Sequence, residues 1–214
     1  MTIMSGHAFG KKTAHLRVTA LTSAYTLGAM LMIALSLAFV AVVVQNLTPH
    51  GVPAVAWATI TGIAIAVGVA IWVFYYQHRQ PGTVLWVPRQ MADFLTKRAK
   101  QTNLSVEAFS LGLTSVAGEI LFAIAPLLIA GAVLAVLPVY LQLAALLGYV
   151  LIASAPLILI TMLVGGGKSI ARIQRWRETN KRFLQFIAGS FLIVLGIYIY
   201  VDIVLGYLHI GKAL

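Results

Sequence analysis

The sequence predicts an all-α integral membrane protein with five transmembrane helices, two interfacial amphipathic helices and an incomplete 3+3 inverted repeat. Hydrophobic residues make up 61% of the 214 residues and charged residues only 9%, whereas soluble domains carry roughly 25% charged residues. Five apolar stretches lack Lys and Arg and reach the length of about 20 residues that a bilayer requires. The basic residues gather on alternate connections between these stretches.

Each of the five stretches is a continuous apolar run without two-residue alternation. We therefore predict helices, which satisfy their own backbone groups in lipid. The predicted spans are 18–44, 54–76, 108–136, 140–164 and 183–208. We interpret 18–208 as a single membrane domain, with a cytoplasmic tail at 1–17 and an outer tail at 209–214, because too few residues remain for a second folded domain.

Residue type indicates where the first two predicted spans end. The first ends at Gln45-Asn46, before a short outer turn rich in Pro and Gly, and its apolar run is too long for a signal peptide. The second ends in aromatic residues that begin at Trp72, which is typical of a helix end at the membrane interface.

The last three spans are also delimited by residue type. The third contains Pro126, which is expected to kink it. Only Leu137-Pro138-Val139 joins it to the fourth, so these two spans should form an antiparallel hairpin. The fourth ends in a run of glycines that begins at Gly165. The fifth carries Gly189 and Gly196 seven residues apart, where another helix can approach closely.

The charge distribution predicts the orientation. The net charge is +10, and 14 of the 15 basic residues lie in the N-terminal tail and in the connections before the third and fifth spans. This positive-inside pattern places the N-terminus in the cytoplasm and the C-terminus outside the inner cell membrane. Because the bilayer accounts for the charge, we expect no nucleic-acid partner.

Two basic segments are predicted to form amphipathic helices on the anionic inner leaflet. One begins at Pro88 and runs to about Thr102, and the other covers 168–182. The basic residues expected to contact lipid headgroups are Arg89, Lys97, Arg98, Lys100, Lys168, Arg172, Arg175, Arg177, Lys181 and Arg182.

Glu119 is the strongest pointer to function. It stands alone in the third span about 11 residues from the inner end, hence roughly 16 Å deep and near the bilayer centre. An acid at this depth is typical of a proton-linked or cation-linked group that faces a cavity. Ser115, Gly118 and Pro126 complete this candidate transport site. The alternative is a protonated structural glutamate bonded to a neighbouring group.

Other polar residues of the spans are weaker candidates. Asp202 lies near the outer end of the fifth span, either as a second ion-linked acid or as an acid that reaches the interface. Four hydroxyl residues either line a path or pack between helices, namely Thr114, Ser115, Ser154 and Thr161.

The sequence offers little for other chemistry. Cysteine is absent, so disulfides, thiolate metal sites and thiol electron relays are excluded. The five histidines have no metal-ligand spacing, and no nucleophile–base pair stands out. We expect no metal, no cofactor and no enzymatic activity.

The C-terminal part joins a basic helix, Arg172–Arg182, to an apolar helix in which glycine recurs, Ile187–Tyr198. Upstream, Ser110–Leu113 leads to Pro126, and Pro156 leads to Gly165. In these features residues 18–205 resemble the six-helix membrane core of the CcdA/DsbD-type thiol-electron transporters, whose superfamily includes LysE-type exporters. The resemblance implies a transport scaffold. It does not imply electron transfer, because that family's first helix and its paired cysteines are missing.

A weak internal repeat accompanies this resemblance. Five residues of the first span recur 120 positions later: Leu21, Ala24, Leu27, Gly28 and Leu31 correspond to Leu141, Ala144, Leu147, Gly148 and Leu151. Spans one and four are expected to run in opposite directions, as are spans two and five, which is typical of inverted-repeat transporters. The third span has no counterpart, so the repeat is incomplete.

We therefore expect a transporter or exporter of small molecules or ions in which Glu119 binds a proton or cation. A homo-oligomer or a partner membrane protein would complete the repeat. The alternative is a non-transporting scaffold subunit that docks a partner protein. A membrane redox relay ranks last, because the chain lacks cysteine.

Overall fold

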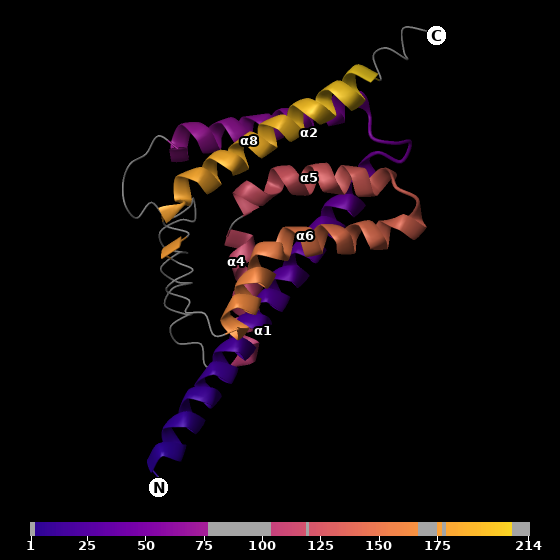
Figure 1. Cartoon of the computed structure of the whole chain (residues 1–214). Helices are drawn as coiled ribbons and strands as arrows, with labels where there is room; N and C mark the ends of the chain where they lie inside the picture. Colours follow the sequence, from indigo (N-terminus) through magenta and orange to yellow (C-terminus); the bar gives the residue numbers. More distant parts are fainter. Residues whose placement is uncertain (1–2, 77–103, 119, 167–174, 177–178, 207–214) are drawn as a thin grey trace. The chain divides into compact units, whose positions relative to one another are not determined.

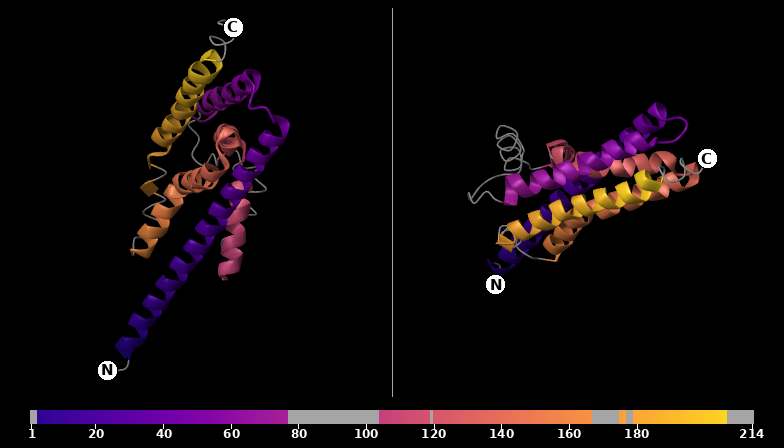
Figure 2. Two further views of the ribbon diagram at one scale, coloured as in Figure 1. Left: turned by 90° about the vertical axis from the view of Figure 1, so that its right-hand side faces the viewer. Right: turned by 90° about the horizontal axis from the view of Figure 1, so that it is seen from above.

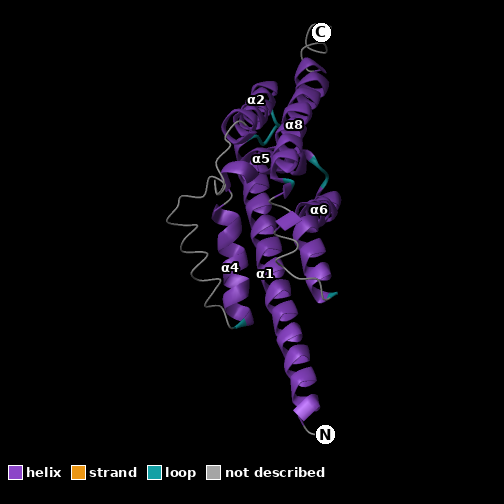
Figure 3. Cartoon of the chain, turned by 60° about the vertical axis from the view of Figure 1, so that its left-hand side comes forward, coloured by secondary structure: helices purple, strands orange, loops and turns teal. Residues whose placement is uncertain are grey.

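The computed structural model describes residues 3–76, 104–118, 120–166, 175–176 and 179–206, and every regular element in this part of the chain is a helix (Figures 1 and 3). In order, the elements are α1 (Ile3–Leu47), α2 (Ala54–Ala70), η1 (Ile71–Tyr76), α4 (Ser105–Gly118), α5 (Ile120–Val136), α6 (Val139–Gly165), α8 (Lys181–Ile199) and η2 (Tyr200–Leu205). Two π-helical stretches, η1 and η2, directly continue the α-helices α2 and α8.

Four helices of the described chain are long and apolar enough to cross a membrane. They are Leu16–Leu47, Ala54–Val73, Val139–Gly165 and Arg182–Leu205. These segments coincide with the first, second, fourth and fifth spans expected from the sequence. The membrane-type helices predicted there are confirmed.

The third predicted span is not confirmed. Residues 108–136 are described as two helices, α4 of 14 residues and α5 of 17 residues, on either side of residue 119. Residue 119 itself lies outside the described residues. The membrane-length helices of the described residues are the four named above, and neither α4 nor α5 alone has the roughly 20 residues that cross a bilayer.

The segments around the spans are described only in part. Helix α1 begins at Ile3, so the segment expected as a tail at 1–17 is helical from its third residue. The first amphipathic segment, 88–102, lies outside the described residues. Most of the second, 168–182, and the outer tail at 209–214 do so too.

Contacts between residues group the chain into two compact units, each assembled from separated stretches. Unit 1 comprises Met1–Ala34, Trp86–Glu119 and Gly148–Arg177, and unit 2 comprises Leu35–Leu85, Ile120–Leu147 and Glu178–Leu214. The chain passes between the units five times, and two of these passages lie within helices, one in α1 and one in α6.

Unit 2 is built around an antiparallel pair of helices, α2 and α8, which run side by side in Figures 1 and 2. A Cβ atom at Gly68 would lie 2.8 Å from the carbonyl oxygen of Gly189, and one at Gly196 would lie 3.2 Å from that of Thr61. Larger side chains would push the backbones apart. The two helices therefore pack closely because glycine stands at each crossing point.

Helix α5 completes the core of unit 2 with small and branched apolar side chains. Its residues Ala125, Ile129 and Ala132 are buried in one cluster with Trp57 and Ile60 of α2. Gly131 of α5 leaves no room for a Cβ against Val40 of α1. Close helix–helix packing by small residues is the usual way in which helices associate in lipid.

Unit 1 consists of the first part of α1, with α4 alongside it (Figure 3) and α6 on another face. Gly28 and Gly112 form the α1–α4 crossing, because a Cβ on either would collide with backbone atoms of the other helix. Gly148, the expected repeat partner of Gly28, has nothing within 4 Å of the position of a Cβ. These two glycines thus have different surroundings, and the inverted repeat is not confirmed.

Candidate functional site

Helix α1 carries a row of hydroxyl groups through the otherwise apolar interior of unit 1. Thr19, Thr22, Ser23 and Thr26 have the spacing of one helix face. Thr22 donates to the carbonyl oxygen of Val18 at 2.8 Å, and Ser23 donates to that of Thr19 at 2.9 Å. Because each of these two hydroxyls donates to its own helix, its lone pairs remain available to accept a hydrogen bond.

Tyr25 links α1 to α4 through a side-chain hydrogen bond. Its phenol donates to Ser115 Oγ at 2.8 Å. Ser115 in turn donates to the carbonyl oxygen of Gly112 at 2.9 Å, so this serine accepts from one helix and donates to its own. The contact is possible because the glycines at the crossing, Gly28 and Gly112, let the backbones approach. Ser115 is thereby fixed in orientation four residues before Glu119 in the sequence.

Thr26 links α1 to α6. Its Oγ1 lies 2.8 Å from Thr161 Oγ1. Thr26 also contacts the carbonyl oxygen of Thr22 at 2.9 Å, and Thr161 contacts that of Leu157 at 2.9 Å. Each hydroxyl has a single proton. The two hydroxyl protons can therefore fill only two of these three contacts at a time. Either Thr26 donates to Thr161 and Thr161 donates to the carbonyl oxygen of Leu157, or Thr161 donates to Thr26 and Thr26 donates to the carbonyl oxygen of Thr22.

The other two hydroxyl residues expected to line a path differ from each other. Thr114 is exposed and donates to the carbonyl oxygen of Ser110 at 3.1 Å. Ser154 is fully buried in α6, and its Oγ has no hydrogen-bond partner among the described residues. Buried polar groups are almost always paired, which makes Ser154 the more informative of the two.

The acidic and proline candidates are placed as follows. Glu119 lies outside the described residues, between Gly118 at the end of α4 and the start of α5. Pro126 is half-buried inside α5, and Asp202 is exposed in η2. Ser115 and Gly118 belong to unit 1, whereas Pro126 and Asp202 belong to unit 2. The described contacts therefore join Ser115 to Tyr25 but do not join these candidates to one another.

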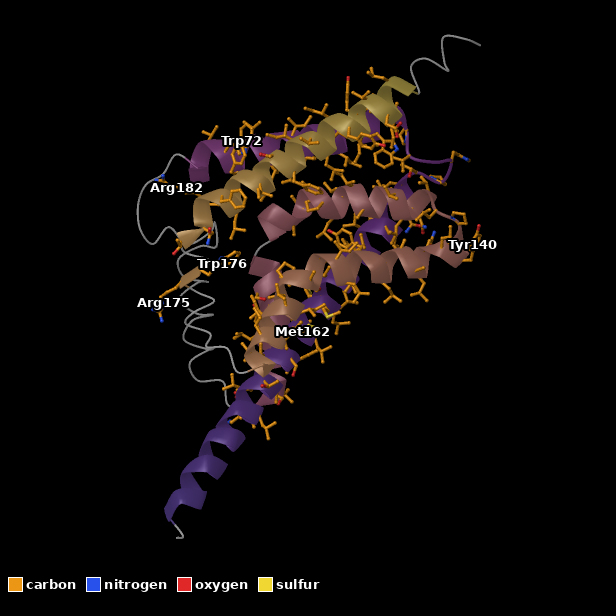
Figure 4. The ribbon with its side chains drawn as sticks, in the orientation of Figure 1. Trp72, Tyr140, Met162, Arg175, Trp176 and Arg182 are labelled. Carbon is orange, nitrogen blue, oxygen red and sulfur yellow. The ribbon has the colours of Figure 1, made fainter. Side chains whose placement is uncertain are left out.

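Of the ten candidate lipid-binding basic residues, three fall on described positions. Arg175 and Arg182 are exposed, and Lys181 is the first residue of α8. Figure 4 labels the two arginines. The remaining seven lie outside the described residues: Arg89, Lys97, Arg98, Lys100, Lys168, Arg172 and Arg177.

Sequence reasoning missed Tyr25 and Thr26, the two residues of α1 that reach α4 and α6. A signal was present, because a hydroxyl at every third or fourth position from Thr19 is unusual in an apolar span. The tyrosine gives no such signal, since its partner is 90 residues away and depends on the glycine crossing.

The arrangement supplies neutral hydroxyl groups rather than metal ligands. The described residues contain no group of three His, Cys, Asp or Glu side chains that could hold a metal ion. Hydroxyls both donate and accept, so such a site suits protons, water or hydrogen-bonding solutes.

No protein-family model, curated protein or solved structure matches the chain. A function is therefore proposed from the four apolar helices and from the hydroxyl contacts of unit 1.

Proposed function

We propose that the protein is a small multi-pass membrane transporter or exporter in which Glu119 binds a proton or cation during alternating access. The Tyr25–Ser115 hydrogen bond is the observation that carries the proposal. It holds a polar contact between two apolar helices immediately before the lone acid of the predicted third span. An acid within membrane helices is usually retained for ion-linked function.

The proposed topology has five spans, with α4 and α5 together forming the third. The antiparallel α2–α8 pair supports a cytoplasmic end where Trp72 and Arg182 lie, as Figure 4 illustrates. The acid Asp202 lies toward the opposite end of α8. A basic group beside an aromatic belt is typical of the inner interface. The N-terminus would then be cytoplasmic, the C-terminus outside, and the basic segments at 88–102 and 168–182 would lie on the anionic inner leaflet.

The proposal includes membership of the LysE/CcdA-like transporter superfamily, without its thiol chemistry. A chain without cysteine cannot relay electrons through thiols. A homo-oligomer or a partner membrane protein would supply the helix that the incomplete repeat lacks.

Proton or cation flux through the purified full-length chain tests the function. Proteoliposomes with a fixed membrane potential would report H⁺ uptake through an internal pH-sensitive dye, and Na⁺ uptake in a parallel assay. We expect Glu119→Gln to reduce the flux at least tenfold, because an amide cannot bind and release a proton. The matched control is Glu107→Gln on α4, an exposed carboxylate in the first turn of that helix that accepts a 3.4 Å bond from the backbone N–H of Leu104.

Equal flux in the Glu119→Gln variant and the wild type would overturn the role of Glu119. Wild-type flux no greater than that of protein-free liposomes, for both ions, would overturn ion-coupled transport. Thermal unfolding of each variant checks that the fold is retained.

A non-transporting scaffold subunit is the second candidate. It is favoured by Gly62 of α2 and Gly148 of α6, which have nothing within 4 Å of a Cβ position on helices that otherwise pack through glycine. Stoichiometric co-purification of one membrane partner, weakened by Gly62→Leu at unchanged stability, would support this candidate.

A further inference from the structure

Ser154 departs from the pattern of most other hydroxyls on the described helices. Eleven serine and threonine side chains contact the carbonyl oxygen three or four residues earlier: Thr22, Ser23, Thr26, Thr48, Thr59, Thr61, Ser110, Thr114, Ser115, Thr161 and Ser190. Ser154 has the carbonyls of Val150 and Leu151 at those positions, yet its Oγ bonds to neither. The Ser154 hydroxyl therefore lacks the acceptor on its own helix that those side chains use.

The side chain is also completely enclosed. Ser154 has 0% of its surface exposed, as does Thr61 in unit 2, which donates to the carbonyl oxygen of Trp57 at 2.9 Å. A buried hydroxyl without a partner costs free energy that alanine at the same position would avoid. Such a group in a native protein calls for a partner, and the described residues provide none.

The neighbouring residues define where that partner would bind. Ser154 lies two helical turns, about 10.5 Å, before Thr161 on the same face of α6. That face packs against α1, because Thr161 contacts Thr26 and Gly165 approaches Thr19. These two contacts run in opposite sequence directions, so α1 and α6 are antiparallel, and extending this register along the helices places Ser154 nearest residues 30–33 of α1. These residues are Met-Leu-Met-Ile, which offer no hydrogen-bond donor.

We propose that Ser154 binds a small neutral molecule through a hydroxyl-type oxygen, held between α1 and α6 in unit 1. The buried polar side chains of the described residues are the neutral hydroxyls of Thr26, Thr61 and Ser154, so a charged ligand would find no counter-charge. Ser154 is completely enclosed, so the bound molecule has to be as small as water or a short alcohol. This site is independent of the role of Glu119.

The direction of the stability change on removing the hydroxyl tests the site. If Ser154 pairs with a bound oxygen, Ser154→Ala lowers the thermal unfolding midpoint of the full-length protein by about 2–4 °C, the shift that loss of one hydrogen bond produces in a chain of this size. Thr61→Val is the matched control, because it removes an equally buried hydroxyl whose acceptor keeps its helical hydrogen bond. We expect it to change the midpoint by less than half as much.

A midpoint for Ser154→Ala equal to or above that of the wild type would overturn the proposal, since the hydroxyl would then be an uncompensated cost. Ser154→Cys separates hydrogen bonding from volume, because a thiol fills the space but bonds weakly. We expect Ser154→Cys to be destabilised as well. Full stability in that variant would show that Ser154 only fills space, and would also overturn the site.

Two measurements on the wild type distinguish the sources of the bound oxygen. Magnetisation transfer from water to the Ser154 hydroxyl in solid-state NMR identifies a bound water. A shift of the Ser154 resonances on titration with ethylene glycol, absent at Thr61, identifies a binding site for a short alcohol. If neither signal is found, the site is rejected. These readouts do not use ion flux, so this proposal and the proposed transport function fail separately.

Discussion

Trp72 and Phe186 join α2 to α8 in two ways at once. Their rings stack with centroids 5.5 Å apart and planes within 3° of each other. The indole N–H of Trp72 also donates to the carbonyl oxygen of Phe186 at 3.3 Å. That oxygen accepts from the hydroxyl of Ser190 at 2.7 Å as well. Because the stacked rings shield this acceptor on one side, the contact fixes the register of the two helices at the end where η1 begins.

Replacing Trp72 separates these two contributions. Trp72→Phe keeps an aromatic ring and loses the N–H bond, so we expect a loss of about 0.5–1 kcal/mol of unfolding free energy. Trp72→Ala also loses the stack and the buried ring area, and should cost about 2–3 kcal/mol. Circular dichroism of thermal or denaturant unfolding in detergent measures both. Tyr140→Phe is the control, because Tyr140 is 79% exposed. Equal losses in the two Trp72 variants would contradict a separate role for the stack.

The glycines of α2 should respond with opposite signs to the same substitution. Gly68→Ala places a Cβ 2.8 Å from the carbonyl oxygen of Gly189, so it should destabilise the protein by about 1–3 kcal/mol. Gly62→Ala meets nothing within 4 Å. It should be neutral or stabilising by up to about 1 kcal/mol, because alanine is the better helix former. Destabilisation of similar size in both variants would show that the α2–α8 crossing does not depend on Gly68.

A double-mutant cycle measures the contact between Tyr25 and Ser115. Tyr25→Phe and Ser115→Ala each remove one partner, so the double variant should cost less than the sum of the single variants. We expect a coupling energy of about 0.6 kcal/mol, the typical value for hydrogen bonds between membrane helices. Tyr198→Phe on α8 serves as the control, because Tyr198 is 64% exposed. Additive single effects would show that the two side chains do not interact.

The proposed orientation can be mapped with single cysteines, because the natural chain has none. His50 lies in the exposed turn between α1 and α2. We expect a membrane-impermeant thiol reagent to label His50→Cys from outside intact cells. Thr2→Cys should be labelled only after the membrane is opened, and Leu214→Cys from outside. Labelling of Thr2→Cys and Leu214→Cys from the same side would contradict five spans.

The membrane helices were the part of the fold that the sequence could predict. The fourth span, expected at 140–164, is α6 at Val139–Gly165, because a hairpin proline and a run of glycines delimit it. The second span, expected at 54–76, corresponds to α2 followed by the π-helical η1, and its membrane-length helix is Ala54–Val73. Hydropathy depends only on composition along the chain, so it predicts such boundaries without knowledge of packing.

Contacts between helices could not be predicted in the same way. The pairing of Tyr25 with Ser115 depends on the Gly28–Gly112 crossing, which is set by packing across distant parts of the chain. Glycines themselves were informative only in part, because the sequence pattern does not distinguish the packed Gly28 from the open Gly148.

The Thr26–Thr161 pair has a consequence for how α1 and α6 hold together. Whichever threonine donates across the interface, the other keeps its proton on its own helix, so the link survives a reversal of polarity without movement of any heavy atom. A neighbour that takes up or gives back a hydrogen bond at one end can thereby change the donor direction at the other end. A change of hydrogen bonding on one helix would thus alter the hydrogen bonding of the other while the spacing of the two helices stays the same.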